Sequence, residues 1–177
     1  MGNFIDNIRT RVWWKNALSL LLLCLLIANV CIIFGLSSED AAQSTDRSEG
    51  VADVIAGVIV DGYHEMDTQH QQNEIHKIHV PLRTVAHFSL FACLGFISTV
   101  LVYSLGLKKW YFTMLSPLLF GLVYAVFDEL HQQFSANRVS DVDDVLTDFA
   151  GVLVAVLITN VVAIALLKAR QAKGGES

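Results

Sequence analysis

A short run of ionisable side chains lies between two long apolar segments in the C-terminal half of the chain. Asp128, Glu129 and His131 are close together in this run, and their side chains are the types that serve as general acids and bases. A charge at the depth of a lipid bilayer costs roughly 3 kcal/mol on insertion scales. Several such groups must therefore pair, bind a ligand or reach water. They predict a functional site, with these three as candidate catalytic residues.

Other polar residues are predicted to reach the same layer. Arg83 and His87 are one helical turn apart and face the same way, and Asp128 and Gln132 are related by i, i+4 spacing. The candidate ligand-binding residues are the polar side chains that helical spacing brings to this layer, together with two serines after the first apolar run: Ser37, Ser38, Arg83, His87, Gln132, Arg138, Asp141, Asp144 and Asp148. If a helix continues through the last three, they fall on one stripe.

Three interpretations of this layer stay open. In a structural one, the acids and Arg138 cap helices and pair across the bundle. In a catalytic one, His131 or a carboxylate is the general base of a hydrolase or transferase, and Arg83 and Arg138 hold a phosphate or carboxylate group. In a binding or transport one, the same residues hold a head group or relay protons.

A metal at this layer is a separate question. The spacing Asp128-x-x-His131 lacks the specificity of an established metal motif, so no metal ligands are assigned and the cofactor is unknown. Six acidic residues nevertheless face two arginines in the layer. Some of this excess must be protonated, solvated or matched by a bound divalent cation.

The segments that position these residues are long and apolar. Apolar residues make up 54% of the 177 residues, and the mean hydropathy is +0.51, which favours a membrane protein. Four segments have about the length of a membrane-spanning helix: Ala17–Leu36, His87–Leu107, Trp110–Phe127 and Phe149–Leu167. They predict an all-α, four-span helical membrane bundle that forms a single domain over residues 1–177. The lipid bilayer is the expected partner, and no basic stripe predicts nucleic-acid binding.

The basic residues near the span ends predict the orientation. Most of them lie on one side of a four-span topology, at Arg9–Lys15, Lys108-Lys109 and Lys168–Lys173. The positive-inside rule then predicts a multi-pass protein of the cell membrane with both termini cytoplasmic. The polar site is predicted to face outside.

The outer connection Ser37–Thr84 is predicted to have two parts. Asp46 and Glu49 have the spacing of a capping box, and the apolar residues of Val51–Ile59 repeat at helical spacing. An amphipathic helix is therefore expected after the first span, on the bundle or on the bilayer surface. The polar stretch Tyr63–His79 is predicted as a solvated loop, or as a metal or proton sensor that uses two of its histidines, His76 and His79. A broken or interfacial helix is expected before the fourth span.

At these residues the chain resembles the VanZ-like family of bacterial membrane proteins. Three groups of residues, in one order, carry the resemblance: Phe34-x-x-Ser37-Ser38 with Ser44 and Ser48; Arg83-x-x-x-His87-Phe88 with Leu94-Gly95; and Tyr124, Asp128-Glu129-x-His131-Gln132-x-Phe134, Arg138, Asp144-Val145-Leu146-x-Asp148 and Gly151. The turn Ser135-Ala136-Asn137 departs from the Pro-Gly that is common in the family.

The resemblance implies a cell-envelope protein. The family's named member is associated with resistance to teicoplanin, a glycopeptide antibiotic with a lipid tail. As partner the resemblance implies a lipid-linked wall precursor or a lipoglycopeptide, recognised or modified at the outward-facing site. It brings no settled reaction, so whether the chain is an enzyme stays open.

Overall fold

Every element in the part of the chain that the structure describes is helical. The computed structural model describes residues 2–134 and 141–174, and these two ranges contain no strand. They form five α-helices and one short 3₁₀-helix: α1 (Gly2–Ser37), α2 (Ala41–Ile59), η1 (Tyr63–Glu65), α3 (Thr68–Ser104), α4 (Trp110–Gln132) and α5 (Val142–Gly174). The predicted all-α fold class is therefore confirmed.

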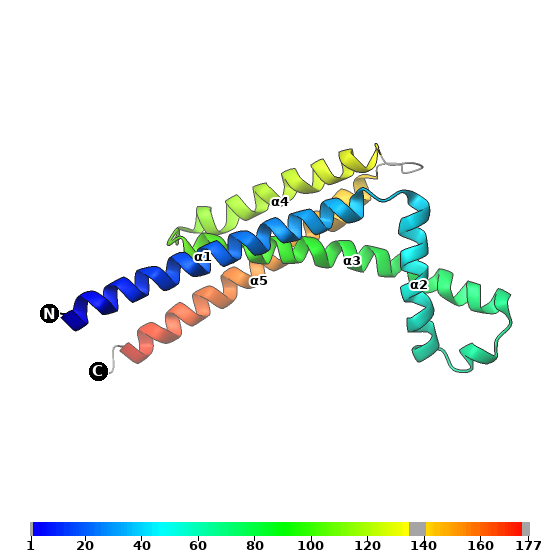
Figure 1. Cartoon of the computed structure of the whole chain (residues 1–177), viewed down its shortest axis with the longest axis horizontal. Coiled ribbons are helices and arrows are strands. Elements are labelled where there is room, and N and C mark those ends of the chain that lie inside the picture. Colours follow the sequence, from blue (N-terminus) through cyan, green and yellow to red (C-terminus); the bar gives the residue numbers. More distant parts are fainter. Residues whose placement is uncertain (1, 135–140, 175–177) are drawn as a thin grey trace.

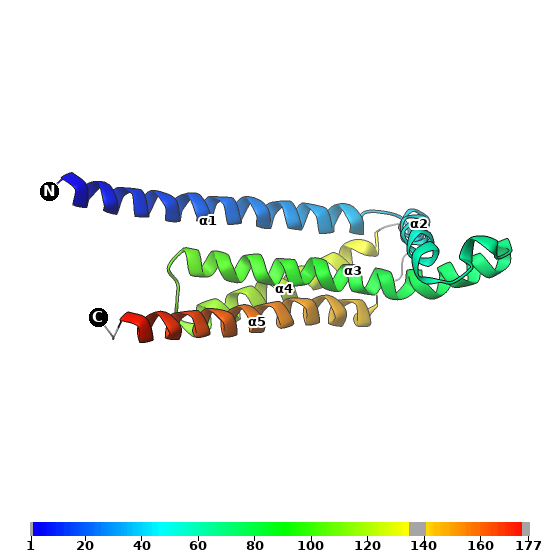
Figure 2. The same ribbon diagram turned by 90° about the horizontal axis from the view of Figure 1, so that it is seen from below.

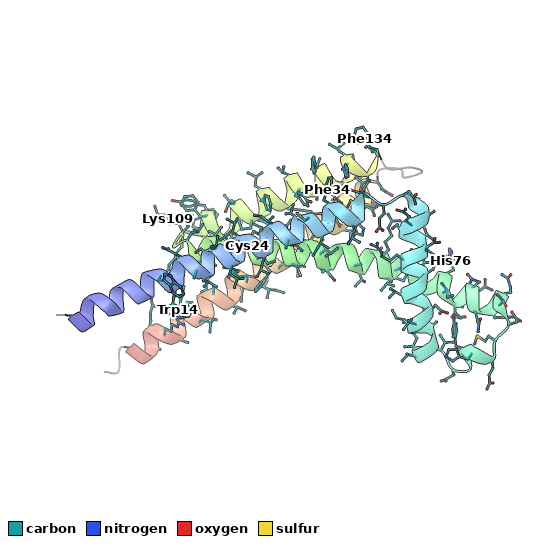
Figure 3. The ribbon with its side chains drawn as sticks, viewed as in Figure 1. Trp14, Cys24, Phe34, His76, Lys109 and Phe134 are labelled. Carbon is teal, nitrogen blue, oxygen red and sulfur yellow. The ribbon has the colours of Figure 1, made fainter. Side chains whose placement is uncertain are left out.

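Four of the helices are long and apolar enough to cross a bilayer, which confirms the four-span prediction. The candidate spans lie in α1, α3, α4 and α5: Trp13–Ser37, Thr68–Ser104, Trp110–Gln132 and Val142–Ala172. These helices run alongside one another, and α3 lies between α1 and α5 (Figures 1 and 2). The start of α1 and the end of α5 lie at one end of the bundle, which we call the terminal end. Trp14 and Lys109 lie toward it, whereas Phe34 and Phe134 lie at the opposite end, the site end (Figure 3).

The bundle is centred on a small apolar core at which α3 and α5 approach closely. The buried core residues come from all four spans: Ile33, Phe91, Leu94, Ala125, Val152 and Val156. A Cβ atom on Gly151 would lie 2.3 Å from the carbonyl oxygen of Phe88, and one on Gly95 would lie 2.8 Å from the carbonyl oxygen of Val152. Any side chain at these two positions would push the backbones apart. Gly151 and Gly95 therefore set the distance between α3 and α5.

Uncharged polar side chains link the helices toward the terminal end. We call this set the neutral layer: Ser19, Tyr103, Ser104, Thr113 and Asn160. The Asn160 side chain accepts from the hydroxyl of Tyr103 at 2.9 Å and donates to the carbonyl oxygens of Thr113 at 3.1 Å and Val156 at 2.9 Å. The hydroxyl oxygens of Ser19 and Ser104 lie 2.9 Å apart. The neutral layer thus ties α1 to α3 and α5 to both α3 and α4.

The predicted amphipathic helix is α2, which lies across the direction of the bundle at the site end (Figure 1). One face of α2 packs on α3 through Ala52 and Ala56, and both side chains are fully buried. The other face exposes apolar side chains, and Val58 is 82% exposed. α2 therefore rests on α3 through one face and exposes apolar side chains on the other.

The beginning of α2 differs from the prediction. Asp40 caps the helix, because its side chain accepts a hydrogen bond from the backbone nitrogen of Gln43 at 2.8 Å. The predicted capping residue, Asp46, lies inside α2. Only three residues separate α1 from α2, so the cap falls at the first acceptor after the turn. Arg47, nearly two turns into the helix, forms an ion pair with Glu39.

The predicted solvated loop over Tyr63–His79 is wrong for most of its length, because α3 begins at Thr68. Asp67 caps α3 by accepting a hydrogen bond from the backbone nitrogen of His70 at 3.0 Å. This bond, and a second from the His70 ring, hold the pKa of Asp67 below its ordinary value. The missed signal is an apolar repeat at helical spacing that packs on α2: Ile75, Ile78 and Leu82.

α3 extends well beyond what a membrane span needs. Its 37 residues make it about 55 Å long at a rise of 1.5 Å per residue. The hydrocarbon core of a bilayer is only about 30 Å thick. The first turns of α3 project past the other spans, with His76 on this extension (Figures 2 and 3). On this extension the Nε2 atom of His79 lies 3.1 Å from the Nδ1 atom of His76. A sensor role for this pair stays a prediction.

The helix predicted before the fourth span, broken or interfacial, is the first part of α5, which continues from Val142 without a break. An interfacial position of this part stays a prediction. Asp141 precedes the helix, and its side chain accepts a hydrogen bond from the backbone nitrogen of Asp143 at 3.0 Å. Asp141 therefore lies at the helix start and does not extend the stripe of Asp144 and Asp148. The first turns of α5, from Val142, lead directly into the apolar run that begins at Phe149, so the helix continues without a break. Arg138 and the turn before it lie outside the described residues.

Candidate functional site

Ionisable and polar side chains from the four spans gather at the site end. We call this set the ionisable layer: Ser37, His87, Asp128, Glu129, Gln132 and Asp148. One ring nitrogen of His87 and one carboxylate oxygen each of Asp128 and Asp148 all lie within 4.8 Å of one another. These three residues come from α3, α4 and α5. The structure therefore brings together candidate site residues that are far apart in sequence.

Asp128 is held firmly within this layer. Its side chain is 1% exposed. Its Oδ2 accepts hydrogen bonds from the hydroxyl of Ser37 at 2.8 Å and from the side-chain amide of Gln132 at 2.9 Å. The bond from Ser37 ties α1 to α4, and the bond from Gln132 spans one turn of α4. Together they fix the rotamer of a carboxylate that would otherwise be buried at high cost.

Asp148 is buried but not satisfied. It is 2% exposed, and its Oδ1 forms no hydrogen bond within the described residues. The Nδ1 atom of His87 lies 3.6 Å from this oxygen, which is too long for a hydrogen bond. An unpartnered buried acceptor costs about 1–3 kcal/mol. Because native structures avoid this cost, the oxygen is a candidate ligand atom.

Glu129 connects two helix ends. Its Oε1 accepts a hydrogen bond from the backbone nitrogen of Asp141 at 2.6 Å, so it joins the end of α4 to the start of α5. Its Oε2 is buried and has no hydrogen-bond partner among the described residues. Glu129 lines neither of the cavities described below. This geometry supports a positioning role, while the acid–base role stays a prediction.

His131 lies against α1 and not beside His87. Its Nε2 is 3.1 Å from the hydroxyl oxygen of Ser38, and its ring stacks on Phe34 with 4.4 Å between the ring centroids. It lines neither of the cavities described below, and it does not join the close cluster of His87, Asp128 and Asp148. Asp128 and His131 therefore have different surroundings. Asp128 belongs to the close cluster, whereas His131 contacts Ser38 and Phe34.

A polar pocket of about 190 Å³ lies between α2, α3 and α5 at the site end. Four of its lining residues were predicted as site residues from the sequence: Arg83, His87, Asp144 and Asp148. Arg83 and Asp144 are exposed, whereas His87 is half-buried and Asp148 is buried. The pocket therefore leads from exposed charges to the Asp148 oxygen that lies 3.6 Å from His87 and has no hydrogen-bond partner among the described residues.

An apolar groove of about 210 Å³ adjoins this pocket. It lies between the end of α1, α2 and α3, and it is lined by apolar side chains from all three: Leu36, Val51, Leu82, Ala86 and Leu90. The ion pair of Glu39 and Arg47 belongs to the same lining. Ser48, Arg83 and His87 line both cavities, so the groove and the pocket are continuous at these residues.

A model of the VanZ/LLP1 family matches residues 20–164 of the 177. The chain belongs to the VanZ/LLP1 family. The matched range includes the whole ionisable layer and both cavities, so the site lies within the family domain. No curated protein and no solved structure matches the chain.

Six residues that line the polar pocket of this VanZ/LLP1 site were not assigned to it from the sequence: Thr45, Ser48, His79, Val80, Thr84 and Thr147. Thr147 lines the pocket beside Asp148, and Thr45 and Ser48 line it from α2. Thr147 is one turn after Asp144, so helical spacing would have found it. Thr45 and Ser48 depend on how α2 lies across α3, and local sequence carries no signal for that contact.

Proposed function

We propose that this VanZ/LLP1 membrane protein binds an amphiphile with an anionic head group. The proposal is supported by the continuity of a charged pocket with an apolar groove, which share Ser48, Arg83 and His87. A head group would lie in the pocket, and its acyl chain would lie along the groove. Ligand sites typically combine apolar walls with a few convergent polar groups in this way.

Arg83 is the residue that would hold the head group. It lines both cavities and is exposed, so its guanidinium is accessible where the two meet. A guanidinium binds phosphate or carboxylate through two parallel hydrogen bonds. Thr45 and Thr147 would add hydroxyl donors for the same oxygens, whereas the hydroxyl of Ser48 donates to the backbone carbonyl of Thr45 at 2.9 Å. Among amphiphiles with such a head group, the family resemblance implies a lipid-linked wall precursor or a lipoglycopeptide of the teicoplanin type as the ligand.

The orientation of the site completes the proposal. Positive-inside patterning predicts the terminal end in the cytoplasm and the site end outside. The pocket would then meet ligands in the outer leaflet, where lipid-linked precursors and lipid-tailed antibiotics insert. Protection against teicoplanin would follow if the protein sequesters the drug or shields the precursor that the drug recognises.

Drug susceptibility tests this function directly. Cells that make equal membrane amounts of wild type, Arg83→Gln or Lys77→Gln are exposed to teicoplanin and to a glycopeptide without a lipid tail. Lys77 is the matched control, because it lies on the same helix and pairs with Glu74 outside both cavities. Wild type and Lys77→Gln should protect against teicoplanin alone, and Arg83→Gln should not. Equal protection by all three proteins would overturn the role of the pocket.

A second candidate function is a membrane-embedded hydrolase or transferase that acts on a phosphate- or acyl-bearing lipid. The observation in its favour is that His87 and Asp148 face each other at the wall of the pocket. A histidine oriented by a carboxylate is a common general base. Replacement of His87 by Gln separates the two functions: a catalyst loses turnover and keeps its affinity for the lipid, whereas a binder loses affinity and protection in proportion.

A further inference from the structure

The close cluster of His87, Asp128 and Asp148 has the composition of a metal site. Each residue comes from a different helix and offers one ligand atom, and the three atoms lie within 4.8 Å of one another. The close packing of Gly151 on Phe88 brings α3 and α5 together one turn from Asp148 and beside His87. The cluster is therefore set by the helix packing and not by a mobile loop.

The distance between His87 and Asp148 fits a shared ion better than it fits a hydrogen bond. The two atoms are 3.6 Å apart, beyond hydrogen-bond range. Two ligands of one tetrahedral zinc ion, each about 2.1 Å from the metal, lie about 3.4 Å from each other. The Oδ1 atom of Asp148 is also buried and has no hydrogen-bond partner among the described residues. An ion at this point would supply the missing partner.

The remaining ligand is already oriented. Asp128 receives hydrogen bonds from Ser37 and Gln132 on its Oδ2 atom. Carboxylates that bind metals are commonly held by such neighbours, which fix their direction and reduce the cost of assembling the site. By contrast, His131 contacts Ser38 and Phe34 and takes no part in the cluster.

From this geometry we infer that His87, Asp128 and Asp148 bind one divalent transition-metal cation of the Zn²⁺ type. An imidazole with two carboxylates favours Zn²⁺ or Mn²⁺ over Mg²⁺ and Ca²⁺, which prefer oxygen ligands alone. Three protein ligands leave one coordination position open, as in catalytic zinc sites. Because His87 and Asp148 line the polar pocket, the open position faces the pocket that also contains Arg83.

This inference deepens the proposed function, since a cation beside Arg83 would add a second positive group for an anionic head group. The part that concerns the head group rests on that proposal. Binding of the cation does not, so it can be tested without any lipid ligand.

The test is metal binding by the purified full-length chain in detergent, with any affinity tag removed. The apo protein is titrated with Zn²⁺ alone by calorimetry, and the metal content is measured after equilibrium dialysis. We expect about one tightly bound Zn²⁺ per chain, a stoichiometry that corresponds to one three-ligand site. Mn²⁺ should compete for the site, and a large excess of Mg²⁺ or Ca²⁺ should not.

Substitutions locate the ion. His87→Gln and Asp148→Asn should each weaken Zn²⁺ binding by more than about tenfold, because each removes a ligand. Asp143→Asn is the matched control, since Asp143 is an exposed acid near the start of the same helix. The substitution His76→Gln accounts for the pair of exposed His76 and half-buried His79, a second candidate zinc ligand set of which His79 also lines the polar pocket. Both controls should bind Zn²⁺ as wild type does.

Three outcomes would overturn the inference. The first is the absence of stoichiometric Zn²⁺ or Mn²⁺ binding by wild type. The second is unchanged binding by both His87→Gln and Asp148→Asn, and the third is loss of binding through His76→Gln alone. Elution as a single folded species excludes misfolding as the cause of a loss. If wild type binds no metal and Arg83→Gln still abolishes protection, only the cation fails and the proposed function stands.

Discussion

The neutral layer and the ionisable layer lie in the same bundle and differ in how their polar atoms are used. In the neutral layer, Asn160 uses every polar atom of its side chain in hydrogen bonds to α3, α4 and its own helix. In the ionisable layer, Asp148 and Glu129 each keep a buried oxygen without a hydrogen-bond partner among the described residues. The neutral layer is therefore complete as it stands, whereas the ionisable layer has capacity for a ligand.

Asn29 shows that an unpartnered atom alone does not define such a site. Its Oδ1 is also buried and without a hydrogen-bond partner in the described part of the chain. It is a neutral amide on α1, however, and it belongs to neither cavity and to no close cluster of ionisable groups. What distinguishes the ionisable layer is the coincidence of buried oxygens that lack hydrogen-bond partners, a histidine beside two carboxylates and an adjoining pocket.

The largest expected effect comes from a change that breaks the ionisable layer without altering any of its residues. Gly151→Leu would place a side chain where a Cβ atom already meets the Phe88 carbonyl oxygen at 2.3 Å. Such overpacking should lower the free energy of unfolding by about 3 kcal/mol and separate His87 from Asp148. The thermal midpoint in detergent and the Zn²⁺ affinity should fall together. A stable protein with normal Zn²⁺ binding would show that this helix contact does not position the site.

The next largest effect is expected in the neutral layer, where a substitution should lower the free energy of unfolding without changing drug protection. Asn160→Leu removes three hydrogen bonds and leaves the hydroxyl of Tyr103 without its acceptor. The free energy of unfolding should fall by about 1–3 kcal/mol, which a thermal shift in detergent would detect. Drug protection by the folded fraction should be unchanged, because the layer is far from both cavities. Loss of protection at equal membrane amount would contradict a purely structural neutral layer.

A change in the ionisable layer should have the opposite result: drug protection should be lost while the thermal midpoint stays unchanged or rises. Asp148→Asn keeps the shape of the side chain but removes the charge of a buried carboxylate that lacks a hydrogen-bond partner on Oδ1. In metal-free detergent the thermal midpoint should be unchanged or higher, by the equivalent of about 1 kcal/mol. Protection against teicoplanin should nevertheless be lost. A marked fall in the midpoint would instead class Asp148 with the structural residues.

The smallest effect concerns an ionisable pair in solvent, which serves as a reference for the buried ones. Hydrogen bonds from His70 lower the pKa of Asp67, so this group stabilises the start of α3 above the ordinary carboxyl pKa of about 4. That contribution should disappear as the pH falls through the lowered pKa. Hydrogen exchange of the first amides of α3, corrected for intrinsic rates, should increase at low pH in wild type. In Asp67→Ala it should be high already at neutral pH.

The sequence predicted the spans well because bilayer thickness imposes a length on every apolar run. It also predicted which residues share a helix face, as Asp128 and Gln132 do, because that relation depends on helical spacing alone. The approach of His87 to Asp148 could not be predicted in the same way. It depends on the packing of Gly151 against Phe88, which joins helices separated by a long stretch of chain.

Contacts between helices account for two differences between the sequence pattern and the structure. Tyr63–His79 is so polar that it was predicted as a loop, yet three apolar residues in and just after it are enough to pack this part of α3 on α2. Helical spacing groups His131 with Asp128, and the structure stacks the His131 ring on Phe34 of α1, while the role of His131 stays a prediction. In both cases a contact with another helix, invisible in the local pattern, determined the outcome.

Because α3 is longer than a membrane span needs, a small change in its tilt displaces its outer end considerably. About 25 Å of the helix exceeds the hydrocarbon core, and α2, which supplies one wall of the pocket, rests on this outer part. A change of about 5° in the tilt of α3 would move the outer tip by about 2 Å, and helix tilt adjusts to bilayer thickness. Such a displacement is large compared with the tolerance of a hydrogen bond. The outer part of α3, and α2 resting on it, would therefore shift when the thickness of the surrounding membrane changes.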